Sequence, residues 1–178
     1  IYQMSCSILS TGRDLPCIKG VGGIKSILLV DYGLLGDLTV TGAEVTAIST
    51  TPAAYQYFVK PGSSGMEQTI TASAENGTVY YDQNVSIQLQ KLDKETQSEL
   101  QDVAKGHPHV FIQDFNGNYF LAGAYNGCDV SAGTIGTGTA LADFTGSLLT
   151  FTAQEQLPAF FCAAGVISAL VIGANIEP

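Results

Sequence analysis

Residues 66–92, MEQTITASAENGTVYYDQNVSIQLQKL, alternate apolar and polar side chains over two segments that meet at Asn76-Gly77. An Asn-Gly pair between alternating segments is a strong β-hairpin signal, because both central residues of a type I′ turn need positive φ. The apolar face of the hairpin would consist of Met66, Ile70, Val79, Tyr81, Val85, Ile87 and Leu89. The opposite face is polar and carries acids without any positive charge. The stretch therefore predicts a broad antiparallel sheet with one core face and one wet face.

Composition limits the classes of protein to which the chain can belong. Its 178 residues suit one domain, and only 13% of them are charged, about half the usual share. With 20 glycines and 46% apolar residues, this composition indicates an all-β protein whose surface is partly covered by partners. The net charge of −9 disfavours nonspecific attraction to nucleic acid and argues against a basic DNA-binding domain.

The cysteines and histidines lack the spacing of a metal site. No CxxC pair is present, and both histidines fall in His107-Pro108-His109, where a proline keeps them from aiming easily at one ion. We expect mostly buried free thiols, which suit assembly in a reducing cytoplasm, although a Cys6–Cys17 disulfide remains an alternative. The four cysteines are Cys6, Cys17, Cys128 and Cys162.

The C-terminal end is apolar, which fits either a membrane span or a segment buried within the protein or an interface. Residues 158–176 contain no charged side chain, and an 18-residue apolar run is a marginal candidate for a membrane span. The run is interrupted by Gly165, Ser168 and Gly173 and lacks flanking Lys or Arg. We therefore expect residues 159–178 to form a buried strand or an interface arm. No signal peptide is recognisable at the N-terminus.

The remaining elements follow from short local patterns. Aliphatic residues 24–30 predict a central strand, and residues 31–52 predict a long irregular loop carrying Leu34, Leu35 and Leu38. Asp93 is a good N-cap for a helix over 94–105, which Lys105-Gly106 would end. Further strands are expected at residues 55–60, 110–115, 119–125, 128–134 and 147–153. The expected fold is mainly β, an antiparallel sandwich or half-barrel with one short helix.

No catalytic or cofactor motif stands out. Residues 136–139 (GTGT) resemble part of a phosphate loop, but no GK[ST] follows, so a turn is the better reading. Asp129, Asp143 and Glu155 are too widely spaced to predict a carboxylate cluster. We expect no enzyme activity, no cofactor and no metal.

The order of elements resembles the tail tube proteins of long-tailed bacteriophages. The resemblance rests on the turn 75–78 (ENGT), the helix at 94–105, and residues 138–146 (GTALADFTG) leading into 149–155 (LTFTAQE). Residues 11–17 (TGRDLPC) with 21–25 (VGGIK) also resemble the start of virion proteins from such phages. The similarity covers about residues 5–160.

This resemblance implies a structural virion protein. Six copies would close a ring by continuing one sheet around a pore, and stacked rings would form the tube that carries DNA to the host. The chain would assemble in the bacterial cytoplasm with other tail proteins, including a sheath where the tail has one. We expect Leu34, Leu35 and Leu38 in subunit contacts, because a lone domain would not easily bury them. We expect Glu67, Glu75 and Asp82 to line the pore.

Two other functions remain open at this point. One is another virion component on a related fold: a tail terminator, a head–tail connector or a capsid decoration protein. The other is a secreted β-sandwich that binds a ligand or carbohydrate, although the chain has no Trp for a sugar platform.

Overall fold

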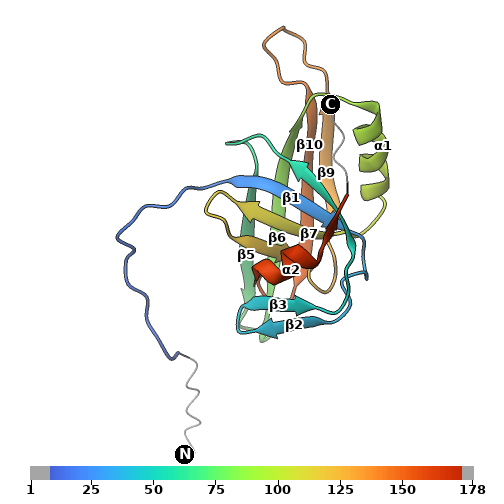
Figure 1. Cartoon of the computed structure of the whole chain (residues 1–178). Helices are drawn as coiled ribbons and strands as arrows, with labels where there is room; N and C mark the ends of the chain where they lie inside the picture. Colours follow the sequence, from blue (N-terminus) through green and yellow to red (C-terminus); the bar gives the residue numbers. More distant parts are fainter. Residues whose placement is uncertain (1–8, 174–178) are drawn as a thin grey trace, which may run out of the picture.

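The computed structural model describes residues 9–173 and contains two β-sheets and two short helices (Figure 1). The larger sheet has the strand order β12-β4-β1-β7-β8-β11-β3-β2, and the smaller sheet has the order β5-β6-β10-β9. The larger sheet consists of β1 (Ile24–Val30), β2 (Leu38–Thr41), β3 (Glu44–Ile48), β4 (Ala53–Phe58), β7 (His109–Asp114), β8 (Tyr119–Ala122), β11 (Phe160–Cys162) and β12 (Val171–Ile172). The smaller sheet consists of β5 (Gly65–Ser73), β6 (Thr78–Gln90), β9 (Asp129–Gly136) and β10 (Gly146–Glu155). The helices are α1 (Lys94–Val103) and α2 (Ala164–Ala169).

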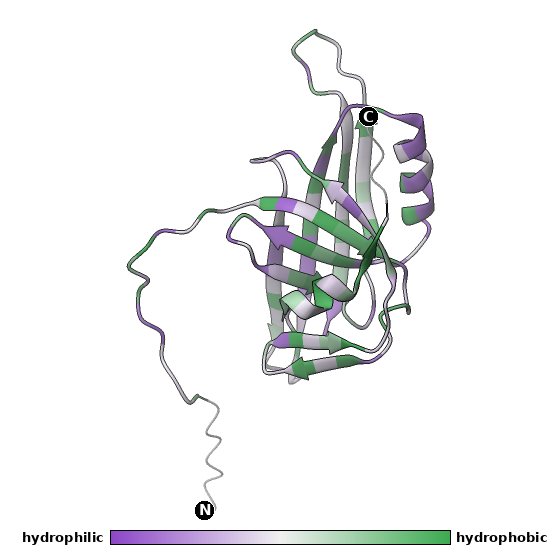
Figure 2. Cartoon of the chain, viewed as in Figure 1, coloured by the Kyte–Doolittle hydropathy of each residue, from purple (hydrophilic) through white to green (hydrophobic). Residues whose placement is uncertain are grey.

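The two sheets pack face to face around one apolar core. Ile27 and Leu29 of β1 face Val85 and Ile87 of β6 across this core, together with Phe151 of β10. Leu100 of α1 belongs to the same cluster and so ties the helix to the sandwich. Figure 2 shows the apolar colour concentrated on the strands and the polar colour on the outer side of α1. Each fully buried aliphatic or aromatic side chain here contributes about 1.5–3 kcal/mol to folding.

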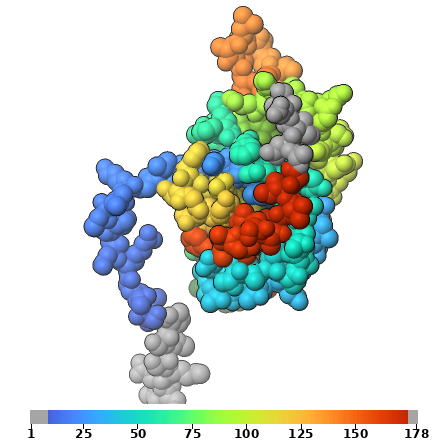
Figure 3. Space-filling view, in the orientation of Figure 1, coloured from blue at the N-terminus to red at the C-terminus, as the bar shows by residue number. Residues whose placement is uncertain are grey.

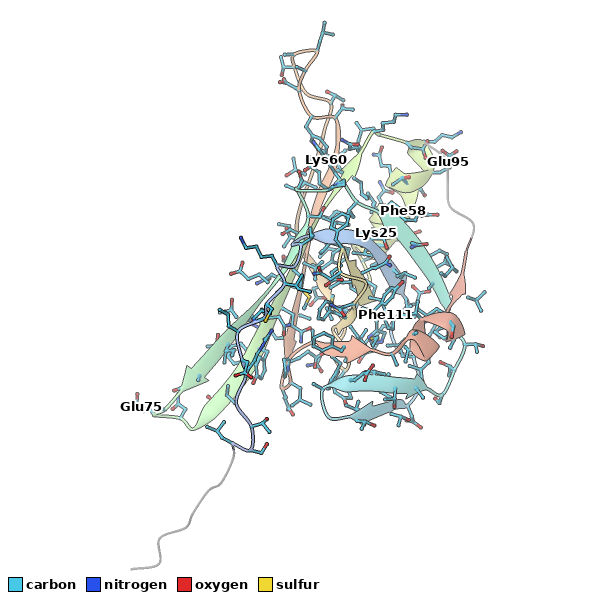
Figure 4. All side chains as sticks on the ribbon, turned by 60° about the vertical axis from the view of Figure 1, so that its left-hand side comes forward. Lys25, Phe58, Lys60, Glu75, Glu95 and Phe111 are labelled. Carbon is cyan, nitrogen blue, oxygen red and sulfur yellow. The ribbon has the colours of Figure 1, made fainter. Side chains whose placement is uncertain are left out.

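A second apolar cluster lies on the other face of the larger sheet. Leu28 and Val30 of β1 point into it, which explains why this strand is an unbroken apolar run: it is buried on both faces. Val45 of β3 and Val166 of α2 meet them there, so the sheet curls around this cluster and α2 covers it. Phe111, labelled in Figure 4, lies inside the same cluster. The mainly β prediction is confirmed.

The predicted long hairpin is present, but its turn differs from the expectation. Strands β5 and β6 pair from Gly65 opposite Ser86 to Ser73 opposite Thr78, which leaves a four-residue turn. Of the Asn-Gly pair, Gly77 alone has a positive φ (65°), so the type I′ prediction is wrong. The apolar face is also buried over only half its length. Val85, Ile87 and Leu89 are core residues, whereas Ile70 and Val79 are exposed.

The segment 31–52 is not one irregular loop. A turn at 32–35 is followed by the hairpin of β2 and β3, which forms one edge of the larger sheet. The three leucines have different environments: Leu34 is exposed, Leu35 is buried in the second cluster, and Leu38 packs partly against it. The expectation that a lone domain would leave Leu35 and Leu38 uncovered is therefore wrong.

The helical predictions need two corrections. Asp93 caps α1 as expected, its carboxylate accepting a hydrogen bond from the backbone N–H of Thr96 at 3.3 Å. The helix ends at Val103 with Ala104 as a right-handed C-cap, so Gly106 does not supply the expected left-handed cap. A second helix, α2, was not predicted. It lies between β11 and β12 in the apolar C-terminal segment.

The C-terminal segment is built into the larger sheet. Strand β11 pairs with β8 and with β3, and β12 pairs with β4. The expected buried strand is present only at β11, because α2 occupies the middle of the described part and both residues of β12 are exposed. None of the helices within residues 9–173 is long and apolar enough to cross a membrane.

Two of the predicted buried thiols are confirmed. Cys128 and Cys162 are buried, and burial raises the pKa of each thiol to about 12. Cys17 is exposed, which corrects the expectation for that residue. Cys6, and with it the alternative Cys6–Cys17 disulfide, lies outside the described residues.

Candidate functional site

The outer face of the four-stranded sheet is a continuous polar surface. The register places Glu67 of β5 opposite Asn84 of β6, and Asn84 opposite Thr152 of β10. The next row places Thr69, Asp82 and Gln154 side by side in the same order. We call this surface the polar face. Its members are Glu67, Thr69, Thr71, Ser73, Thr78, Tyr80, Asp82, Asn84, Ser86, Gln88, Asp129, Ser131, Ala132, Thr134, Leu148, Thr150, Thr152 and Gln154, of which Ala132 and Leu148 are apolar.

Hydrogen bonds between side chains hold the polar face together across all four strands. The Asp82 carboxylate accepts a bond from Gln154 Nε2 at 2.9 Å and from Thr71 Oγ1 at 3.4 Å. The Thr152 hydroxyl lies 2.9 Å from Asn84 Oδ1 and 2.8 Å from Ser131 Oγ. These polar groups therefore satisfy one another along the surface and fix the side chains relative to the sheet.

The charge on the polar face has a single sign. Strands β5, β6, β9 and β10 contain no Lys or Arg, whereas Glu67, Asp82 and Asp129 contribute carboxylates. At the β9 edge, the Asp129 carboxylate contacts Nδ1 of His107. The surface therefore offers hydroxyls, amides and carboxylates, and it repels a polyanion more than it attracts one.

The two edges of this sheet are open. Strand β5 pairs with β6 on one side, and β9 pairs with β10 on one side. Within the described residues no strand pairs with the other side of either, so each presents backbone N–H and C=O groups along its length. Both strands are long and mostly exposed. Long uncovered edges are a template for pairing with another chain.

Two of the three predicted pore residues lie on this face. Glu67 and Asp82 occupy neighbouring rows, whereas Glu75 lies in the hairpin turn at the far end of the sheet (Figure 4). Sequence reasoning missed Asp129, Thr152 and Gln154. The alternation Leu148, Thr150, Thr152, Gln154 along residues 148–154 was a signal for an outward face, but its alignment with Asp82 depends on strand pairing that no local pattern reveals.

The carboxylates of Asp129, Asp143 and Glu155 do not form a cluster, and each makes its own structural contacts. Glu155 is buried and accepts hydrogen bonds from the backbone N–H groups of Tyr125 (3.0 Å) and Asn126 (2.8 Å). Asp143 caps its own loop, and Asp129 pairs with His107. Within residues 9–173 no group of three or more His, Cys, Asp or Glu side chains has the geometry of a metal site.

The histidines also have distinct environments. His109 is buried: its Nδ1–H donates to the Gly123 carbonyl at 2.6 Å, and its Nε2 accepts from the Gly33 N–H at 3.2 Å. The ring stacks on Tyr32 with centroids 5.4 Å apart. Burial is the main cause that lowers the pKa of His109, which therefore stays neutral as a structural residue.

A cavity of about 410 Å³ lies between α1 and the larger sheet. Tyr32, Tyr55 and Tyr57 line it together with Glu99 and Asp102. The Tyr57 hydroxyl donates to Glu99 Oε2 at 2.7 Å, and burial, followed by this hydrogen bond, raises the Tyr57 pKa. The cavity is therefore aromatic and acidic, and His107, which also lines it, pairs with Asp129 at the β9 edge of the polar face.

Comparisons with protein-family models, curated proteins and solved structures found no match.

Proposed function

We propose that this chain is a structural subunit that closes into a ring, and that stacked rings form a phage-type tail tube through which DNA passes. In this proposal the polar face lines the pore. The observation that carries it is a cation-free polar sheet face bounded by two open strand edges.

The strand directions favour ring closure. All pairings inside the sheet are antiparallel, so β5 and β10 run one way while β6 and β9 run the other way. When rotational symmetry brings the β9 edge of one copy beside the β5 edge of the next, these two strands are again antiparallel. The sheet therefore continues without a change in pairing, and closure removes both open edges.

The dimensions of such a ring suit a DNA conduit. Six copies of a four-stranded sheet would give a 24-stranded barrel. With strands about 4.8 Å apart and tilted by roughly 40°, the backbone diameter is about 48 Å. Inward side chains reduce the free width to roughly 35–40 Å, which admits a DNA duplex.

The chemistry of the polar face suits passage without binding. Lys or Arg on a pore wall would release counterions from the DNA phosphates and hold the DNA in place. Carboxylates repel phosphates over about a Debye length, ~8 Å at physiological salt. Thr152, Asn84 and Gln154 are in part hydrogen bonded within the face, and neutral hydroxyl and amide groups offer a phosphate only weak contacts compared with Lys or Arg.

Electron microscopy of the purified full-length protein tests this proposal. Tubes built from rings with a central hole are the expected result. Closed single rings that never stack would instead favour a tail terminator, connector or decoration protein. Protein that remains monomeric at all concentrations, with no rings, would contradict the proposal.

The cavity beside α1 supports a second candidate, a ligand-binding β-sandwich. Three tyrosines and two carboxylates in one hollow are suited to a cationic or hydroxyl-rich small molecule. Under this alternative the protein would remain a monomer, with β5 and β9 unpaired at the sheet edges. A Tyr55→Ala variant would then lose binding of the small molecule. Monomeric protein that captures such a molecule from a metabolite mixture would favour this second candidate.

A further inference from the structure

A different segment projects from each end of the four-stranded sheet: the loop 137–145 from one end, and the end of the β5–β6 hairpin, with its turn 74–77, from the other. We call these two segments the projections. Strand β10 runs from Gly146, which is opposite Gln90 and Gly136, to Glu155, which is opposite Tyr81. The loop 137–145 therefore leaves one end of the sheet, and the hairpin turn 74–77 leaves the other. Figure 4 shows Glu75 at the hairpin tip and Lys60 near the opposite end.

The loop 137–145 presents one leucine to solvent. Asp143 Oδ2 accepts hydrogen bonds from the backbone N–H groups of Thr139 (2.9 Å) and Ala140 (2.7 Å), which fixes the turn of the loop. Leu141 next to this turn is fully exposed, at 109%. Figure 3 shows the loop, in orange, standing clear of the body.

The hairpin end presents an apolar strip. Ile70 lies opposite Tyr81, and Ala72 lies opposite Val79, on the continuation of the core face of β5 and β6. Ile70 is 63% exposed and Val79 is 52% exposed, because the hairpin extends past the larger sheet that covers its other half. Within the described residues nothing packs over this strip closely enough to bury it.

The charges at the two ends are complementary. Lys60 and Lys91 lie at the loop end: the Lys60 N–H donates to the Gln88 carbonyl at 3.1 Å and the Lys91 N–H to the Thr145 carbonyl at 3.0 Å. Glu75 lies at the hairpin tip. Between residues 9 and 173, the ion pairs of the structure involve none of these three side chains.

We infer that the two projections bind each other between copies of this chain, the hairpin of one copy overlapping the 137–145 loop of a copy in the next ring. The tip of each projection then meets the base of the other. Leu141 packs on Ile70 and Val79, while Glu75 reaches Lys60 and Lys91. The contact joins opposite ends of two identical molecules, so it does not close on itself and extends into a filament. This inference rests on the proposed ring assembly and specifies how rings stack.

Leu141→Ser tests the apolar half of the contact. Because Leu141 makes no close packing contact within its own subunit, the variant should fold and melt like wild type. We expect it to form closed rings and no tubes in electron micrographs under conditions in which wild type forms tubes. Val171→Ser is the matched control, since Val171 is 58% exposed on β12, which belongs to the larger sheet and pairs with β4; this variant should form tubes.

A charge exchange tests the polar half. Glu75→Lys and Lys91→Glu should each shorten or abolish the tubes, and the double variant should restore them. Tubes of wild-type length from Leu141→Ser, or no recovery in the double variant, would overturn the stacking contact while leaving the ring intact. Wild-type protein that forms neither rings nor tubes would overturn the ring proposal and this contact together.

Discussion

At the scale of single residues, buried polar groups join the two sheets at one corner of the molecule. Gln83 of β6 is buried, with its Oε1 accepting from the Gly123 N–H at 3.0 Å and its Nε2 donating to the Leu157 carbonyl at 3.2 Å. The Gly123 carbonyl accepts from His109, and Glu155 holds the turn that follows. A buried polar network of this kind is costly to break, because each orphaned group loses its partner without gaining water.

Gly123 occupies a backbone position in this corner that only glycine fits without strain. Its φ is +64°, and an added Cβ would lie 2.6 Å from the backbone carbon of Gly127 and 2.7 Å from Cys128 Sγ. We expect Gly123→Ala to destabilise the fold by roughly 2–4 kcal/mol, measured by urea denaturation. Gly117→Ala is the matched control: it has φ +86° but open space around it, so about 1 kcal/mol is expected. Equal losses would show that the close contact does not matter.

His109 gives folding stability a pH dependence. Burial lowers its folded-state pKa below the ordinary value of 6.5, so the unfolded chain binds the proton more readily. The stability that comes from neutral His109 is therefore complete above about pH 6.5 and declines as the pH falls through that value. We expect the free energy of unfolding to fall between pH 7 and pH 5, with a smaller fall in His109→Asn. His107→Gln, which leaves His109 in place, should keep the fall; an unchanged slope in His109→Asn would contradict this account.

At the scale of elements, the sequence was informative where the pattern is local. The β5–β6 hairpin, β1 and α1 were predicted because alternation, an unbroken apolar run and an N-cap are visible within a few residues. The hairpin of β2 and β3 was missed because glycines and short strands read as a loop. Strands β11 and β12 pair with strands that are far away in the sequence, so no local pattern predicts their pairing. Helix α2 is only six residues long, which is too short for a clear helical pattern.

The candidate surface was predictable to the same extent. Glu67 and Asp82 followed from alternation along the hairpin, and the register puts both on the polar face. Asp129, Thr152 and Gln154 join them through pairings of β10 with β6 and β9, which depend on tertiary structure. Leu35 was misassigned to an interface because the second core that buries it is formed by segments distant in the chain.

Strand β5 gives a prediction at this scale. Successive N–H groups along an edge strand point alternately toward its neighbour and outward, and proline is tolerated where the N–H points outward. Of Thr69→Pro and Ile70→Pro, one should therefore keep wild-type folding stability. We expect that variant to lose ring formation in sedimentation velocity, because its outward N–H is needed for pairing with β9 of the next copy. Thr39→Pro and Val40→Pro on β2, an edge strand of the larger sheet, are the controls. Whichever of these two variants folds should still form rings. If a folded β5 proline variant still forms normal rings, the β5 edge does not pair with β9 of the next copy.

At the scale of the whole molecule, the proposed assembly would cover surfaces that a lone domain leaves exposed. Both edges of the smaller sheet are open, the hairpin carries exposed Ile70 and Val79 beyond the body, and residues 9–22 form an extended arm (Figure 1). The arm is tied down at Val21, which exchanges hydrogen bonds with Asn116. A ring would cover the edges, and stacking would cover the hairpin strip. The low density of charge fits a chain with large contact areas.

The polar face as pore wall is the central claim, and a cryo-electron microscopy map of the assembled full-length protein tests it most directly. We expect a continuous barrel of β-strands around the axis, with β5 of each copy beside β9 of the next. The side chains of Glu67, Asp82 and Thr152 should point toward the axis. A map in which this face lies on the outer surface, or in which the pore wall is lined by Lys and Arg, would contradict the claim.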